Sequence, residues 1–204
     1  MTDTEASRPD KRALITDAAI AVFAEKGYRS ARVADVAKVA GVADGTIYLY
    51  FKNKEDLLLS IFEEKMGMFL DALREDLEGV DCPLETIRIY VKHHFQQLKT
   101  NPLIAQVFQV ELRQSHKFLR EYRPEPLWDY LNVFGDAVKE AQVRGMVRSD
   151  VDPFIAKWAF FGAMDELAIQ WVLSRKRERF DLEAAAVQVV ETFFRGVLTA
   201  NPQE

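Results

Sequence analysis

A single cysteine, Cys82, occurs among the 204 residues, so no internal disulfide can form and a reducing compartment is the simplest interpretation. Glycine and proline are also scarce, with nine and seven residues, which leaves long segments free to form helices. The most apolar stretch, residues 154–173, contains charged side chains such as Lys157 and Asp165 and is not expected to span a membrane. Residues 1–10 are polar and lack the apolar core of a signal peptide. We therefore expect a cytoplasmic protein with no membrane partner.

Histidine is equally scarce, with three residues. His93 and His94 are adjacent, so they point to different sides of a helix, and His116 falls in a predicted loop. The sequence has no metal-ligand spacing, no nucleophile motif and no glycine-rich phosphate loop. Asp165 and Glu166 are neighbours on a predicted helix, where salt bridges or hydrogen bonds explain them better than catalysis. We therefore expect no catalytic residue, no metal site and no cofactor.

The charge is unevenly distributed along the chain. The total is 27 basic and 32 acidic residues, a net charge of −5. Residues 1–54 carry nine Lys or Arg and seven Asp or Glu, whereas residues 55–204 carry eighteen and twenty-five. A weakly basic N-terminal part on an acidic body would orient the molecule as it approaches DNA.

Apolar residues recur at spacings of three and four throughout, and no segment alternates with period two for long enough to predict a sheet. We therefore predict an all-α protein. Gly27 and Gly41 are expected to end the first two helices, and Asn53 with Asp56 forms a variant of the capping box at the start of the fourth. The nine predicted helices cover approximately residues 11–26, 33–40, 43–51, 53–78, 83–100, 103–115, 127–144, 153–175 and 181–199.

Three short predicted helices followed by a long one, with a glycine turn between the second and third, are typical of a helix-turn-helix. Gly41 allows the tight turn, and the third helix would bury Val42, Ile47 and Phe51. Its other face would meet the major groove, where Gly45 keeps the surface low and tyrosine or lysine side chains suit phosphates. Alternatively, the same segment would be a plain three-helix bundle with surface tyrosines.

The segments 33–37, 41–51 and 54–58 are similar to the signature of the TetR family of transcriptional repressors, with hydrophobic, glycine and aromatic positions all in register. The resemblance implies a nine-helix repressor with a helix-turn-helix DNA-binding head, residues 8–54, and a ligand-binding and dimerisation body, residues 55–204. It implies that Thr46, Tyr48, Tyr50 and Lys54 hold phosphates, with Gly45 and Tyr48 near bases.

This chain departs from the family pattern at two places. The family often has Thr or Ser before the second helix, where this chain has Ala31 and Arg32, so we expect Ser30 to cap the helix and Arg32 to contact phosphate. Ala43 replaces the usual Ser at the start of the third helix, which removes one cap and one hydroxyl. The predicted DNA-binding residues are therefore Ser30, Arg32, Ala43, Gly45, Thr46, Tyr48, Tyr50, Lys52 and Lys54.

One recognition helix reads only a few base pairs, so proteins of this layout bind inverted repeats in double-stranded DNA as homodimers. The segment 153–175 is apolar around most of its circumference, more than one buried face requires, and Gly162 would permit close helix approach. Alternatively, this segment and 181–199 are internal core helices. The predicted dimer interface comprises Phe154, Trp158, Gly162, Val190, Phe193 and Phe194.

Bulky residues in the body could line a cavity for a small hydrophobic effector, although such aromatics more often form plain core. A basic run beside them would suit an anionic head group at the mouth of the cavity. The predicted ligand-binding residues are Phe69, Phe95, Phe108, Leu112, Arg113, Arg120, Arg123, Trp128, Tyr130, Phe134, Phe161 and Trp171.

Residues 42–56, 62–69, 111–115 and 161–166 also resemble the acyl-CoA-responsive fatty-acid-degradation repressors, a branch of the TetR family. This resemblance implies a long-chain fatty acyl-CoA that releases the repressor from a palindromic operator and so controls fatty-acid degradation genes. The alternative is a repressor of the same architecture that responds to a drug, an aromatic compound or a free fatty acid, for example one that controls an efflux pump.

Overall fold

The computed structural model describes residues 10–115, 117–118, 121–175 and 180–199, and within these segments it contains helices but no β-strand. The all-α prediction is confirmed, and each of the nine predicted ranges overlaps an α-helix. The helices are α1 (Lys11–Lys26), α2 (Val33–Ala40), α3 (Asp44–Ile47), α4 (Lys54–Asp76), α5 (Pro83–Thr100), α6 (Pro102–Gln106), α8 (Glu125–Val143), α9 (Pro153–Leu173) and α10 (Leu182–Val197).

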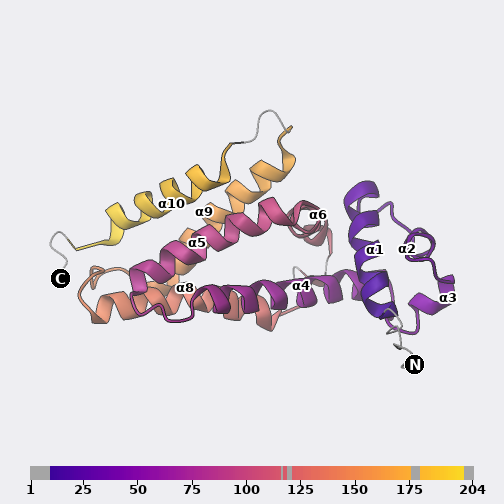
Figure 1. Ribbon diagram of the computed structural model, residues 1–204, viewed down its shortest axis with the longest axis horizontal. Helices are drawn as coiled ribbons and strands as arrows, with labels where there is room; N and C mark the ends of the chain where they lie inside the picture. Colours follow the sequence, from indigo (N-terminus) through magenta and orange to yellow (C-terminus); the bar gives the residue numbers. More distant parts are fainter. Residues whose placement is uncertain (1–9, 116, 119–120, 176–179, 200–204) are drawn as a thin grey trace, which may run out of the picture.

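Helices α1 to α3 gather at one end of the molecule and form what we call the head; the rest is the body (Figure 1). Helix α4 begins at the head and runs into the body beside α8, against which it packs. Helix α5 packs between α8 and α10, and α9 also contacts α8. No helix in the described segments is long and apolar enough to cross a membrane.

Local sequence signals set the helix starts. Asp10 caps α1 by accepting a hydrogen bond from the backbone N–H of Arg12. Asn53 caps α4 by accepting from the N–H of Asp56 at 2.8 Å, and the Asp56 carboxylate accepts in turn from the N–H of Lys52. The variant capping box predicted at residues 53–56 is therefore confirmed. The Asp56 side chain accepts from the N–H of Lys52 rather than from that of the N-cap residue, Asn53.

Two predicted helices differ in the structure. Helix α3 ends at Ile47, because the N–H groups of Leu49 and Tyr50 bond to carbonyls three residues back rather than four and tighten the chain into turns. The predicted helix 103–115 consists of α6, a π-helical turn η1 (Val107–Glu111) and a 3₁₀ turn η2 (Leu112–Gln114). A π-turn places one extra residue in the turn and often occurs at functional sites.

The same segment joins the body to the head. The Gln106 side chain donates to the carbonyl of Ala24 in α1 at 2.6 Å. The buried Glu111 carboxylate accepts from the backbone N–H of Tyr28, also at 2.6 Å. Because both bonds run from α6–η1 to the end of α1 and the loop that follows it, this segment holds the head against the body.

Candidate DNA-binding surface and effector cavity

The turn between α2 and α3 has the geometry that the sequence predicted. Gly41 has φ of 68°, a left-handed conformation that a glycine adopts without strain. Ile47 and Phe51 are 1% and 2% exposed and join the core, while Val42 packs partly buried against it. The opposite face of α3 is therefore turned outward.

Most of the predicted DNA-binding residues lie on the surface of the head, around α3 and at the start of α2. Thr46 is half-buried, and the following are exposed: Ser30, Arg32, Ala43, Gly45, Tyr48, Tyr50 and Lys52. Helices α2 and α3 lie at the end of the head remote from the body (Figure 1). Sequence reasoning overlooked Leu49, which is 81% exposed beside Tyr48 and could contact a thymine methyl group. The sequence does show an apolar residue at this position of a face that is otherwise polar, and this could have identified Leu49.

The start of α2 is capped differently from the prediction for Ser30. Arg32 occupies the N-cap position, and its backbone N–H donates to the Asp35 carboxylate at 2.9 Å. Lys26 donates to the same carboxylate at 2.8 Å. The hydrogen bond from Lys26 is the main cause that lowers the pKa of Asp35, and the hydrogen bond from Arg32 adds to it. The preceding residue, Ala31, is buried, so a hydroxyl there would not lie on the surface. Ser30 is not the cap of this helix.

Lys54, which is predicted to contact a phosphate, also makes hydrogen bonds within the protein. Its ammonium group donates to the backbone carbonyls of Tyr28, Ala31 and Arg29 at 2.7, 2.9 and 3.3 Å, and it lies 4.6 Å from the centre of the Tyr28 ring. Partial burial lowers its pKa. Since an ammonium has three donors, the group is fully engaged inside the head and holds the loop before α2.

Lys54 and Lys52 provide a matched test of these two roles. Lys54→Met should lower the free energy of unfolding by about 2 kcal/mol, because two part-buried carbonyls and one exposed carbonyl lose a charged donor. Lys52→Met should leave stability unchanged and reduce the salt dependence of operator binding by about one phosphate contact. Thermal melts and fluorescence anisotropy at several salt concentrations measure both. Equal melting temperatures for the two variants would contradict the assignment of Lys54.

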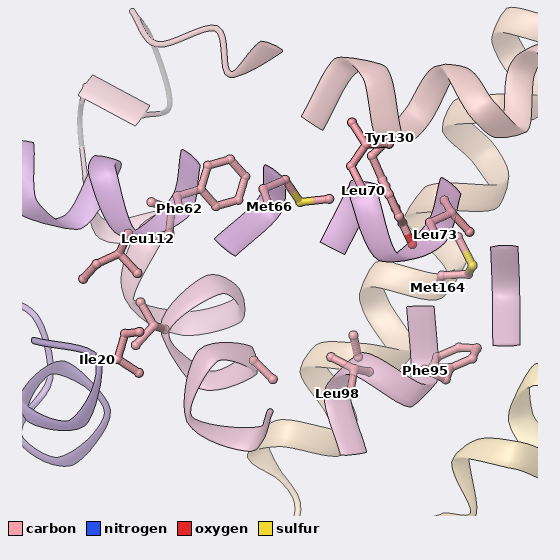
Figure 2. Packing of buried hydrophobic residues seen from close by; sticks show 14 of the residues in the cluster. Ile20, Phe62, Met66, Leu70, Leu73, Phe95, Leu98, Leu112, Tyr130 and Met164 are labelled. Carbon is pink, nitrogen blue, oxygen red and sulfur yellow. The ribbon is translucent and has the colours of Figure 1, made fainter. Parts of the chain in front are cut away.

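The body contains a partly open cavity of about 260 Å³ between α4, α5, α8, α9 and the η1–η2 segment. Figure 2 shows Phe62 and Met66 on α4, with Leu112, on the side near Ile20 of the head, and Tyr130 toward the other end. The cavity is slightly smaller than the usual range for small-molecule sites. Of the predicted ligand-binding residues, six line it: Phe69, Phe108, Leu112, Arg113, Tyr130 and Phe161.

The other predicted ligand-binding residues lie elsewhere, and Arg120 is outside the described residues. Phe134 stacks on Phe160 at 4.4 Å in the core toward α9 and α10. Trp128 packs edge-on against Trp158 near the surface. Neither of them lines the cavity, and the same holds for Phe95, Arg123 and Trp171.

Several lining residues were absent from the predicted set. Met66 lies four residues after Phe62 and three before Phe69, so helical spacing could have found it. The histidines were set aside because they are adjacent, yet both reach the wall. Phe62, one of the bulky residues of the body considered for this role, also lines the cavity, and the lining residues missed are Met66, His93, His94, Gln97, Leu98, Ala105, Gln109, Phe118, Leu127 and Asp165.

Burial also changes the ionisation of His94, whose side chain lines the cavity. Desolvation lowers the pKa of His94 from 6.5 to about 4, and the nearby Asp165 carboxylate opposes this only in part. An unfolded chain keeps a histidine pKa near 6.5. Between pH 4 and 6.5 the histidine is protonated in the unfolded chain but not in the folded protein. The free energy of unfolding is therefore highest, with respect to His94, above pH 6.5 and decreases as the pH falls toward 4.

We therefore expect acid sensitivity from this residue. The free energy of unfolding should fall by about 3 kcal/mol between pH 6.5 and 4 through His94. Subtracting the profile of His94→Gln, measured by urea unfolding, isolates this contribution from that of the carboxylates. Superimposable profiles for the two proteins would show that His94 does not titrate as inferred.

The predicted dimer interface divides into two groups. Phe154 is 63% exposed and Trp158 is 37% exposed, and Gly162 is also exposed, so α9 presents an apolar surface. Val190 and Phe194, in contrast, are buried side chains of α10. Phe193 is half-buried. It packs against core rings at 4.6 Å and 5.3 Å. Because α10 packs on α5, Val190 and Phe194 belong to the core of the protomer, and a direct role for them in the subunit interface stays a prediction.

A helix-turn-helix head joined through a long helix to an all-α body defines a DNA-binding protein of the helix-turn-helix class. The family model of bacterial regulatory proteins of the tetR family matches residues 15–61, and the model of the YsiA-like protein C-terminal region matches residues 62–196. The chain belongs to the TetR family of bacterial regulatory proteins.

Relatives match along nearly the whole chain. A fatty acid metabolism regulator protein of Bacillus subtilis is 40% identical over 183 residues, which cover 90% of this chain and 93% of the relative. The fatty acid degradation regulator FadR of Bacillus halodurans has a TM-score of 0.84 at 41% identity, with 93% and 97% of the two chains covered. FadR of Bacillus subtilis, solved in complex with stearoyl-CoA, has a TM-score of 0.83 at 40% identity, with 90% and 98% covered.

Proposed function

We propose that this protein is a transcriptional repressor that binds an inverted-repeat operator as a homodimer and is released by a long-chain fatty acyl-CoA. Its targets would be fatty-acid degradation genes. We divide the chain into a DNA-binding part, residues 8–54, and an effector-binding and dimerisation part, residues 55–204. It acts by binding rather than catalysis, without a cofactor, and it works in the cytoplasm, where its DNA lies.

The observation that carries this proposal is the cavity in a body whose fold and sequence match those of a regulator solved with stearoyl-CoA. The interior wall is mostly aromatic and aliphatic, which suits an acyl chain. Arg113 lies at the rim with its side chain nearly half exposed and paired with Asp165. A guanidinium in this position can exchange that partner for an anionic group of the effector.

The effector must bind the DNA-free state more tightly than the DNA-bound state if it is to release the operator. Helix α4 is one route for this coupling, because it starts at the head and supplies Phe62, Met66 and Phe69 to the cavity wall. A long chain needs more room than the cavity has, so its entry displaces lining side chains. Movement of α4 then changes the spacing of the two heads.

The η1 turn is a second route of the same kind. Phe108 in this turn lines the cavity, while Glu111, three residues on, holds the N–H of Tyr28 in the head. Displacement of Phe108 would therefore pull on the bond to the head. Because a π-turn can relax to an α-turn by a shift of one residue, this segment offers two discrete arrangements rather than a gradual bend.

The test combines native mass spectrometry with operator binding. A C12–C18 acyl-CoA that co-purifies with the protein would support the proposal. Micromolar stearoyl-CoA should then release an inverted-repeat DNA in a gel-shift assay, whereas free CoA should not. If stearoyl-CoA binds the free and the operator-bound protein with equal affinity, the switching mechanism is wrong.

A repressor that responds to another apolar compound is the second candidate, since an apolar cavity alone does not select for CoA. In that case stearoyl-CoA would fail to release the operator while a drug, an aromatic compound or the free fatty acid succeeded. The gel-shift assay with these ligands separates the two candidates.

A further inference from the structure

The polar side chains in the cavity wall are almost all paired within the protein. His93 contacts Asp76 at 2.8 Å and the Phe69 carbonyl at 3.1 Å. The Gln97 side-chain oxygen accepts from the amide of Asn101. Arg113 donates both to the side-chain oxygen of Gln109 and to the carboxylate of Asp165.

His94 is the exception in this wall. Its Nδ1 atom lies 3.1 Å from the Tyr130 hydroxyl. Its Nε2 atom is buried and has no hydrogen-bond partner among the described residues. A buried polar atom without a partner is unfavourable, and in a binding site it commonly marks the place of a ligand atom.

The bond to Tyr130 decides which hydrogen-bonding role Nε2 plays. Burial keeps the His94 ring neutral, so one nitrogen carries a proton and the other accepts. A phenol is a good donor and an imidazole nitrogen a good acceptor, so Tyr130 donates to Nδ1. The proton of the ring is then on Nε2, which becomes a donor that seeks an oxygen atom.

We propose that His94 recognises the thioester carbonyl of the acyl-CoA effector, with Nε2–H donating to the carbonyl oxygen. This inference rests on the function proposed above. Nε2 is covered in this structure, so the effector must shift the surrounding wall slightly to reach it.

The surroundings favour a thioester over a free carboxylate. A neutral donor compensates an uncharged carbonyl oxygen well, but it leaves most of the desolvation of a carboxylate uncompensated. Asp165 lies close enough to act electrostatically on His94. Its negative charge would repel the carboxylate of a free fatty acid bound at His94. Because Asp165 pairs with Arg113 at the rim, a carbonyl held at His94 leaves the CoA outside and the chain among the apolar side chains.

A pair of ligands tests the carbonyl contact without altering the protein. Stearoyl-CoA carries the carbonyl, and S-octadecyl-CoA, a thioether of the same chain length, lacks it. By isothermal titration calorimetry the wild-type protein should bind the thioester about tenfold more tightly than the thioether. A ratio below twofold would overturn the proposal, whereas failure of both ligands to bind would overturn the proposed function itself.

Two variants then assign the contact to His94. In His94→Gln the side-chain amide can place a donor near the position of Nε2, so most of the thioester preference should remain. In His94→Asn the amide reaches only the position of Nδ1, so the two ligands should bind within about twofold of each other. Thermal melts establish that both variants fold. An unchanged tenfold ratio in His94→Asn would show that another group binds the carbonyl.

Discussion

Replacing Gly45 by glutamate should abolish operator binding while the protein stays folded and dimeric. A Cβ atom at Gly45 would meet no atom within 4 Å, and the residue lies in helical backbone, where glutamate is favoured over glycine. In the proposed complex the new carboxylate would stand against DNA phosphates and base edges. Like charges in an interface cost several kcal/mol, so we expect operator affinity to fall at least about 100-fold.

Gly45→Ala is the matched control, since it adds only a methyl group and should bind the operator nearly as well as the wild type. Fluorescence anisotropy with a labelled inverted repeat measures affinity, and thermal melting measures stability. If Gly45→Glu binds the operator within a few-fold of the wild type, the outward face of α3 is not the surface that enters the groove.

The same substitution at Gly162 should instead dissociate the dimer. Gly162 lies on the exposed apolar face of α9, and a Cβ atom there also meets nothing within 4 Å in the protomer. In a symmetric interface each substitution appears twice, so two carboxylates would face each other without partners. A buried charge without a partner costs about 3–5 kcal/mol, and the dimer dissociation constant should rise at least about 100-fold.

Sedimentation velocity measures this change, and Gly45→Glu serves as the dimeric control with the same added charge. Met68→Glu is a second control, because Met68 is exposed on α4, away from α9 and α10. Operator affinity should also fall in Gly162→Glu, since a single head binds only one half-site. If Gly162→Glu remains a dimer at nanomolar concentration, the subunits associate through another face.

The head was largely predictable because its signals are local in the sequence. Gly41, Ile47 and Phe51 lie within eleven residues, and their spacing alone determines which face of the third helix is buried. The exposed face follows by exclusion, which is why residues such as Tyr48 were placed outward correctly. The hydrogen bonds of Lys54 were not predictable, because its carbonyl partners lie 23 to 26 residues away, across a turn whose path no local pattern describes.

The body was predictable only as a set of amphipathic helices. Phe108 and Phe134 have the same chemical character, yet one lines the cavity and the other stacks on Phe160. Helical periodicity identifies a buried face but not which neighbour that face meets. For the same reason Val190 and Phe194 were assigned to the subunit interface, whereas α10 turns them toward α5.

The helix-turn-helix of the head and the all-α class were therefore determined by the sequence itself, through spacings of three and four residues and the positions of capping residues. The pairing of Arg113 with Asp165, 52 residues apart, and the single unpaired nitrogen of His94 were decided only by the tertiary structure. Such contacts depend on how helices distant in the chain pack against one another. That packing is a property of the assembled core, and no single segment encodes it.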